Sequence, residues 1–200
     1  MRIVGGRWAG HDLTSPGGRV RPTAEALRDR WMSLLEKDLD GARILEIYAG
    51  TGALGLEALS RGARYVDFVE NGPSALHALK ANVAALRVQK RARIFKRDAL
   101  PFIARLDPHA YDIALADPPY RGKQPDRVVE QWLRNNFSRI LVVQHAADHP
   151  LPGRGRRHVY DDAALTIFRS RARAGAPARG RSHRPPRGRR PSGGNRPPGD

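Results

Sequence analysis

The sequence contains no cysteine among its 200 residues. This absence excludes disulfide bonds, zinc sites with thiolate ligands and cysteine nucleophiles, and it agrees with a reducing compartment. No apolar run approaches the roughly 20 residues of a membrane-spanning helix, and no apolar stretch typical of a signal peptide follows Met1. We therefore expect a cytoplasmic protein with neither membrane contact nor a bound metal.

Acidic residues are few compared with basic ones. The chain has 36 lysines and arginines against 20 aspartates and glutamates, which gives a formal net charge of +16. Residues 171–200 carry nine arginines and one acid, and the preceding 170 residues are also basic. A polyanionic partner, above all nucleic acid, is the expected consequence. The alternative is a solvated arginine-rich surface without a specific partner.

The hydrophobic pattern predicts three regions. Residues 1–22 form a basic arm that resembles a hairpin, residues 23–170 form the folded domain, and residues 171–200 form a disordered tail of Arg, Pro, Gly and Ser. Within the domain, strands and helices alternate and a hairpin follows. This order predicts an α/β fold: a doubly wound, mostly parallel, seven-stranded sheet with an antiparallel C-terminal hairpin. We expect strands at 43–48, 64–70, 92–96, 111–116, 139–144, 156–160 and 164–168. Before the first strand, Thr23 can cap a helix that runs to about Lys37.

A glycine-rich turn follows the first of these strands. Residues 44–55 read as strand, glycine turn and helix, which is the unit that holds a nucleotide-like cofactor. Gly50, Gly52 and Gly55 fit the spacing G-x-G-x-x-G, although Gly55 also fits a helix-packing role. At the ends of the next two strands, Glu70 can accept ribose hydroxyls and Asp98 can accept an adenine amine or cap the helix that starts at Ala99. Up to this point NAD and S-adenosylmethionine fit equally well.

The motif Asp117-Pro118-Pro119-Tyr120, which follows the fourth strand, distinguishes these cofactors. Two prolines fix a rigid turn and remove two backbone donors, so that acceptors remain beside the carboxylate. Tyr120 offers a flat face on which a base can stack. An exocyclic amine needs such acceptors and such a platform to attack a methyl group in line. The motif therefore favours S-adenosylmethionine, whereas its alternative interpretation is a turn that only ends a strand.

Several stretches together resemble the RsmD family of class I S-adenosylmethionine-dependent methyltransferases, which methylate the N2 amine of a guanine in bacterial 16S ribosomal RNA. They are residues 2–6, 21–23, 44–63, 68–70, 117–120 and 164–168, and they span the chain from residue 2 to about residue 169. The departures are Glu46 where the family usually has Asp, Gln144 where it often has Glu, a short segment after Tyr120, and the arginine-rich tail. The alternatives are a DNA adenine-N6 or other amino methyltransferase, an inactive RNA-binding relative, and an NAD-dependent oxidoreductase.

The resemblance implies roles for individual residues. The catalytic residues are Asp117, Pro118, Pro119 and Tyr120, which receive the target guanine. The cofactor-binding residues are Arg21, Thr23, Glu46, Tyr48, Ala49, Gly50, Thr51, Gly52, Glu70, Asn71, Asp98 and Ala99. The RNA-binding residues are Arg2, Arg7, Trp8 and Arg19, and the tail extends this contact without sequence preference. The implied partner is 16S rRNA or an assembling 30S subunit, and we expect the enzyme to be a monomer.

Overall fold

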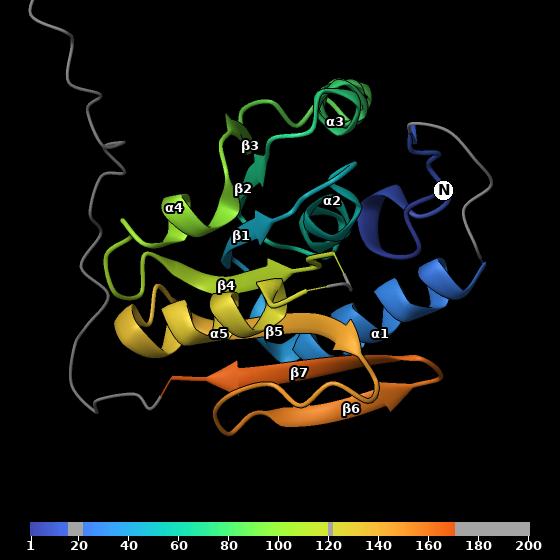
Figure 1. Cartoon of the computed structure of the whole chain (residues 1–200). Coiled ribbons are helices and arrows are strands. Elements are labelled where there is room, and N and C mark those ends of the chain that lie inside the picture. Colours follow the sequence, from blue (N-terminus) through green and yellow to red (C-terminus); the bar gives the residue numbers. More distant parts are fainter. Residues whose placement is uncertain (16–21, 120–121, 171–200) are drawn as a thin grey trace, which may run out of the picture.

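The computed structural model describes residues 1–15, 22–119 and 122–170. Its sheet has the strand order β3-β2-β1-β4-β5-β7-β6 (Figure 1). The strands are β1 (Arg43–Ile47), β2 (Tyr65–Glu70), β3 (Ala92–Lys96), β4 (Tyr111–Ala116), β5 (Ser138–Ala146), β6 (Arg156–Tyr160) and β7 (Ala163–Arg169). Strands β1 to β5 pair in parallel, and β7 runs antiparallel to both β5 and β6. The predicted fold class is confirmed.

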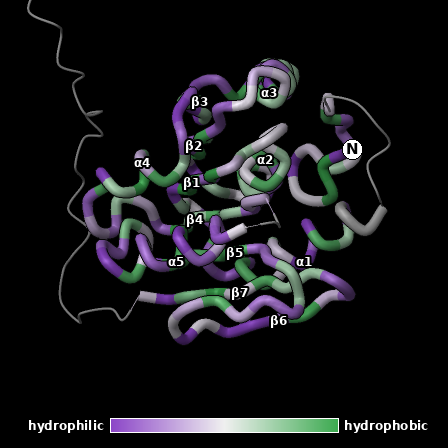
Figure 2. Tube along the Cα trace, in the orientation of Figure 1, coloured by the Kyte–Doolittle hydropathy of each residue, from purple (hydrophilic) through white to green (hydrophobic). Residues whose placement is uncertain are grey.

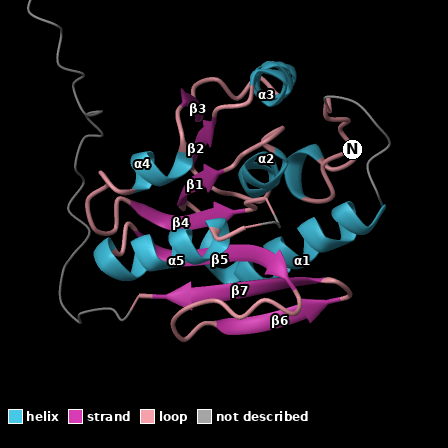
Figure 3. Ribbon diagram, viewed as in Figure 1, coloured by secondary structure: helices cyan, strands magenta, loops and turns pink. Residues whose placement is uncertain are grey.

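Helices cover both faces of this sheet (Figure 3). They are a single 3₁₀ turn, η1 (Gly6–Trp8), and the α-helices α1 (Pro22–Leu39), α2 (Ala53–Ser60), α3 (Pro73–Ala85), α4 (Ala99–Ile103) and α5 (Gln124–Asn135). One buried cluster joins α1, α2 and α3 to one face of the sheet, and a second joins α4 and α5 to the other. Because parallel strands are buried on both faces, hydrophobic residues run through the central strands, while the edge strand β6 is hydrophilic (Figure 2).

The first strand shows how the sequence produces these layers. Alternate side chains of a strand point to opposite faces. Ile44 accordingly packs in the cluster of α1, α2 and α3, whereas Leu45 and Ile47 pack in the cluster of α4 and α5. Glu46 lies on the same face as Ile44, where it meets α2. The strand thus places one carboxylate under the helix that follows the glycine turn.

Two local expectations need correction. Helix α1 begins at Pro22, so Thr23 lies in the first turn and does not precede the helix as its cap. Proline suits this first position because its fixed φ matches the helix and its missing N–H has no partner there. Within the described part of the N-terminal arm, residues 1–15, the chain does turn back on itself, but a single antiparallel bridge, Arg2 to Asp12, joins the two sides, and η1 lies between them. The predicted tail, residues 171–200, lies outside the described residues.

The order of the strands creates a switch point beside β1. The chain passes from β1 outward to β2 and β3, and then crosses to β4 and β5 on the other side. Ligands of such sheets bind beyond the carboxyl ends of the strands at this point. Among the described helices, none combines the length and the hydrophobicity that crossing a membrane requires.

Candidate active site

The glycine turn after β1 has left-handed backbone at three positions. They are Tyr48 (φ 57°), Gly50 (φ 55°) and Gly52 (φ 77°). A Cβ on Gly52 would lie 2.3 Å from Leu79 Cδ1, so this glycine serves both the turn and the packing against α3. A Cβ on Gly50 would meet nothing within 4 Å. Gly50 therefore leaves open space at the switch point, as a cofactor loop requires.

The third glycine has a packing role. A Cβ on Gly55 would lie 2.6 Å from Glu46 Oε2 and 2.7 Å from side-chain atoms of Phe68 and Val66. The same glycine donates its backbone N–H to Glu46 Oε2 at 2.7 Å. Gly55 thus lets α2 lie close enough to β1 for its backbone to bind a buried carboxylate. The match to G-x-G-x-x-G comes from this packing, as expected from the helix-packing interpretation.

Glu46 is a buried acid with neighbours of its own charge. Its side chain is 3% exposed. Its pKa is raised to about 8, above all by loss of hydration and also by the nearby carboxylates of Asp117 and Glu70, while the N–H groups of Gly55 and Leu54 act in the opposite direction. In the free protein at neutral pH the carboxyl group is therefore mostly protonated. A bound cation beside it would favour the ionised form.

A pocket of about 240 Å³ lies next to the glycine turn. It is lined by Tyr48, Val69, Glu70, Asn71, Arg97, Asp98, Ala99, Leu100, Pro101 and Gln124. Five of the predicted cofactor-binding residues, Tyr48, Glu70, Asn71, Asp98 and Ala99, therefore share one cavity. Gln124 is not among the residues predicted from the sequence, although its position after the loop that follows β4 could have pointed to it.

Glu70 holds the glycine turn in place. Its Oε2 accepts the N–H of Gly50 at 2.7 Å, and its Oε1 accepts the N–H groups of Asn71 at 2.9 Å and Gly72 at 2.7 Å. The carboxylate therefore braces two loops at once. Each oxygen has more than one lone-pair direction, so acceptor capacity for a hydroxyl group remains, mainly on Oε2.

Asp98 stands at the N-cap position of α4, but its side chain makes no capping hydrogen bond. Its Oδ1 accepts a hydrogen bond from the side-chain amide of Asn71 at 2.5 Å, and this bond joins the ends of β2 and β3. Across the pocket, the Tyr48 hydroxyl donates to Gln124 Oε1 at 3.1 Å. This bond ties the glycine turn to the first residue of α5, the helix that follows the loop after β4.

The Asp-Pro-Pro segment leaves β4 beside this site. Ala116 at the end of β4 is the register partner of Ile47 at the end of β1, so the two strands deliver their loops side by side. Loss of hydration raises the pKa of Asp117 to about 6, even though part of its side chain reaches solvent. Pro118 is buried and Pro119 is exposed. Tyr120 and Arg21 lie outside the described residues, as does the side chain of Thr23.

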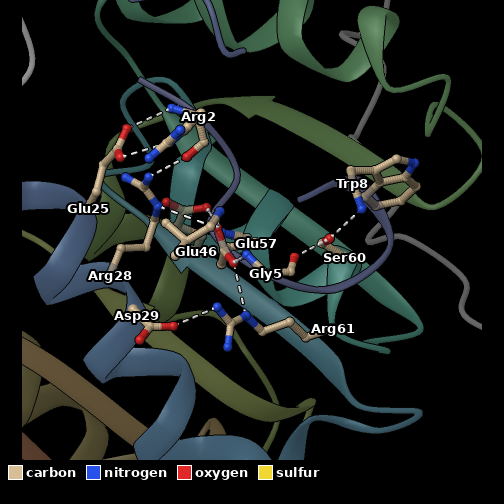
Figure 4. A network of polar contacts seen from close by, with 12 residues as sticks. Arg2, Gly5, Trp8, Glu25, Arg28, Asp29, Glu46, Glu57, Ser60 and Arg61 are labelled. Carbon is tan, nitrogen blue, oxygen red and sulfur yellow. Dashed lines mark hydrogen bonds and ion pairs between the residues drawn. The ribbon is translucent and has the colours of Figure 1, made fainter. Parts of the chain in front are cut away.

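The N-terminal arm is fixed to the domain by a buried acid (Figure 4). Glu57 on α2 is fully buried and accepts the N–H groups of Val4 at 2.8 Å and Gly5 at 2.7 Å. It also pairs with Arg61 at 2.9 Å and Arg28 at 3.6 Å. The sequence analysis did not single out Glu57, but one acid in the otherwise apolar stretch of α2, residues 53–59, was a signal that could have found it.

The four predicted RNA-binding residues have different surroundings. Arg2 pairs with Glu25 on α1 at 3.3 Å. Arg7 is exposed, and its guanidinium carbon lies 5.7 Å from the centre of the Trp8 ring. Trp8 is half-buried and donates its backbone N–H to Ser60 Oγ at 2.9 Å. Arg19 lies outside the described residues.

The charges at the switch point favour a cationic ligand over an anionic one. Glu46, Glu70, Asp98 and Asp117 all lie at the carboxyl ends of neighbouring strands. The dinucleotide NAD would bring a negatively charged pyrophosphate to the glycine turn, next to Glu70. A sulfonium ion with an amino group brings positive charge to the same place. These four acidic side chains therefore fit S-adenosylmethionine and argue against NAD.

Comparison with known proteins also indicates a methyltransferase. A family model described as Conserved hypothetical protein 95, which represents the RsmD family, matches residues 1–157. The chain belongs to the RsmD family. The predicted resemblance is confirmed, and so is the expectation that the chain is a methyltransferase.

Relatives and solved structures agree with membership of the RsmD family. The Ribosomal RNA small subunit methyltransferase D of Escherichia coli is 38% identical over 161 residues, which cover 76% of this chain and 78% of the relative. The enzyme of the same name from Haemophilus influenzae is 29% identical over 160 residues, with coverage of 76% and 81%. The structure of yhhF from Escherichia coli, a candidate methyltransferase, has a TM-score of 0.74 and 28% identity, with coverage of 84% and 97%.

Proposed function

We propose that this protein transfers a methyl group from S-adenosylmethionine to the exocyclic N2 amine of a guanine in 16S ribosomal RNA. One observation supports this most. The segment Asp117-Pro118-Pro119 emerges from β4 beside the β1 glycine turn, in a chain of the RsmD family. An amine acceptor site and a cofactor site therefore share the same edge of the sheet. The relatives named as ribosomal RNA methyltransferases support ribosomal RNA as the substrate.

The cofactor-binding residues have complementary tasks in this proposal. S-adenosylmethionine supplies an electrophilic methyl group when it is bound. Glu46 and the backbone of residues 49–52 surround its amino-acid part, with Arg21 and Thr23 near the same end. Glu70 accepts a ribose hydroxyl while it braces Gly50. Asn71, Asp98 and Ala99 line the pocket that receives the adenine, and Tyr48 closes it through its bond to Gln124.

The acceptor residues compensate for the weak nucleophilicity of the amine. The lone pair of a guanine N2 amine is delocalised into the ring. Asp117 and the backbone carbonyls beside Pro118 and Pro119 accept its two N–H bonds, which localises the lone pair and aligns it with the methyl group. Tyr120 stacks on the base, which must leave its neighbours to enter the site. The proton that the amine loses passes to Asp117, whose raised pKa of about 6 suits it to accept a proton and to return it to water.

The remaining parts of the chain serve the RNA. In this proposal the docked arm contacts 16S rRNA or an assembling 30S subunit through Arg2, Arg7, Trp8 and Arg19. The tail, residues 171–200, adds nonspecific attraction through its nine arginines. The enzyme works as a cytoplasmic monomer in which residues 23–170 form the methyltransferase domain.

Nucleoside analysis tests the proposal. Purified protein, labelled S-adenosylmethionine and 16S rRNA or 30S particles from a strain that lacks the gene are incubated, and the digested RNA is analysed by mass spectrometry. We expect N2-methylguanosine, and we expect Asp117→Asn to lower the rate while Asp107→Asn, an exposed aspartate between α4 and β4, does not. N6-methyladenine in DNA would indicate the alternative methyltransferase. Tight NAD binding without S-adenosylmethionine binding in calorimetry would contradict the cofactor.

A further inference from the structure

A second cavity lies between the N-terminal arm and the end of α3. Its volume is about 440 Å³. Its walls include Arg7 and Trp8 from η1, His11 from the arm, and Arg87 and Arg91 from the segment after α3. None of the described residues that line it has a carboxylate. We call this cavity the Trp8 pocket; it is a basic site with one aromatic wall.

Trp8, which forms the aromatic wall, is anchored to the folded domain. The backbone N–H of Trp8 donates to Ser60 Oγ, which fixes the main chain, and the ring itself packs in part against the core of α1, α2 and α3. In Figure 4 the indole lies away from the network around Glu57. The guanidinium group of Arg7 stands 5.7 Å from the ring centre. A fixed indole beside a cation is the combination on which nucleic-acid bases stack while their phosphates are neutralised.

The basic wall contains a residue in a strained conformation. Arg87 follows the C-cap residue Leu86 of α3 and has φ 54°. Helices favour glycine at this left-handed position, because any side chain there costs stability. Strain of this kind accumulates where function requires a particular side chain. Arg91 is fixed as well, since its guanidinium group donates to the carbonyl groups of Ala63 and Arg64.

The Trp8 pocket is remote from the candidate active site. Helix α3 begins just after the carboxyl end of β2 and runs for 13 residues to Ala85, where the pocket lies. At 1.5 Å per residue the helix separates the two places by about 20 Å. A single nucleotide cannot span this distance, whereas a folded RNA can touch both ends at once.

We propose that the Trp8 pocket binds a nucleotide of the substrate RNA that is distant from the methylated base. Arg7, Arg87 and Arg91 neutralise its phosphate, and its base stacks against Trp8. The inference rests on the proposed function, because it takes the substrate to be RNA. It assigns the end of α3, which the motifs of the sequence do not mark, to substrate binding.

Replacement of Arg87 by glycine separates binding from folding. Glycine adopts φ 54° without strain, so the melting temperature of Arg87→Gly should equal or exceed that of the wild type. Loss of one phosphate contact at 0.15 M salt should weaken binding about four- to sixfold and lower the slope of log K against log salt by about 0.7 to 0.9. Arg87→Lys should retain most of the affinity, because it keeps the charge. The probe is a 16S rRNA transcript, and binding is measured with the full chain, so that the tail contributes equally to every variant.

Arg105→Ala is the matched control. Arg105 is exposed, follows α4 and belongs to the other face of the sheet, so its loss removes the same charge from a different place. If Arg105→Ala and Arg87→Gly weaken RNA binding equally, the proposed nucleotide site is wrong and general charge attraction explains the binding. Unchanged binding by Arg87→Gly would also overturn the proposed site. Weakened binding to 30S particles but not to the bare transcript would indicate a ribosomal protein as the partner and overturn the RNA site. If the wild type methylates the transcript or 30S particles in these cases, the proposed function survives; if it methylates neither, both fail.

Discussion

Replacement of Glu46 by glutamine should change how the stability of the protein depends on pH. The folded state raises the pKa of Glu46 from its ordinary value of 4.5 to about 8. A carboxyl group with a raised folded pKa contributes stability that is fully present below its unfolded pKa and is lost as pH rises toward its folded pKa. Over this window the folded protein holds one proton that the unfolded chain releases. Glutamine carries no titrating proton and still offers an oxygen to the N–H of Gly55.

The magnitude follows from linkage. One proton of difference corresponds to about 1.4 kcal/mol per pH unit. Between pH 5 and pH 7.5 the wild type should therefore lose about 3 kcal/mol of unfolding free energy relative to Glu46→Gln. Other titrating groups change both proteins alike, so that their contributions cancel in this difference. Above the folded pKa the difference should level off.

Urea unfolding of both proteins across pH 5 to 9 measures this difference. Glu36→Gln is the matched control, because it makes the same substitution at an exposed position on α1 and should change stability by less than about 0.5 kcal/mol. A constant difference between wild type and Glu46→Gln from pH 5 to 7.5 would refute the reasoning. It would mean that Glu46 is ionised in the folded protein and that hydrogen bonds from α2 outweigh its lost hydration.

Three further predictions concern the arm, the turn and the acceptor site. Glu57→Ala should lower the unfolding free energy by about 3–5 kcal/mol in urea titrations, because it leaves the buried Arg28 without its ion-pair partner and two N–H groups without their acceptor, whereas the exposed Glu130→Ala should not. Gly55→Ala should cost about 1–3 kcal/mol, since its Cβ collides with β1 and β2; unchanged stability would contradict the packing role. The kcat/KM for methyl transfer should fall about tenfold per pH unit below the Asp117 pKa of about 6, and Asp117→Asn should abolish this dependence; a wild-type profile that is flat below pH 6 would exclude Asp117 as the acceptor.

Much of the architecture could be predicted from the sequence, because strands, helices and turns are encoded by residues that lie close together in the chain. The boundaries of β3, β4 and β6 agree with the expected residues, since charged or turn-forming residues flank each of these segments. The assembly of the acids at the strand ends also follows from topology alone, as parallel strands end at one edge. The predicted start of α1 at Thr23 is wrong, because the preference of proline for the first turn places Pro22 inside the helix and outweighs the capping ability of threonine.

The contacts that fix the arm could not be predicted in the same way. Glu57 meets Val4 and Gly5, which are more than 50 residues away in the chain, and no local pattern encodes such a distance. The basic composition of the arm predicts an RNA-binding element. The structure shows that Arg2 is paired with Glu25 and that the arm is bonded to α2. Exposed charge in a sequence therefore predicts attraction to RNA better than it predicts which arginine is available for it.

The glycine turn links these observations. Two carboxylates hold it from opposite sides: Glu70 binds the N–H of Gly50, and Glu46 binds the N–H of Gly55 just beyond the turn. The turn is therefore positioned before any ligand arrives, which reduces the ordering that binding requires. Of these two acids, Glu46 is buried and shares its surroundings with Asp117 and Glu70, so that lost hydration above all, and then mutual repulsion, opposes its ionisation. A cation placed among the three relieves this repulsion, and the same arrangement that costs stability in the free protein therefore favours a positively charged cofactor.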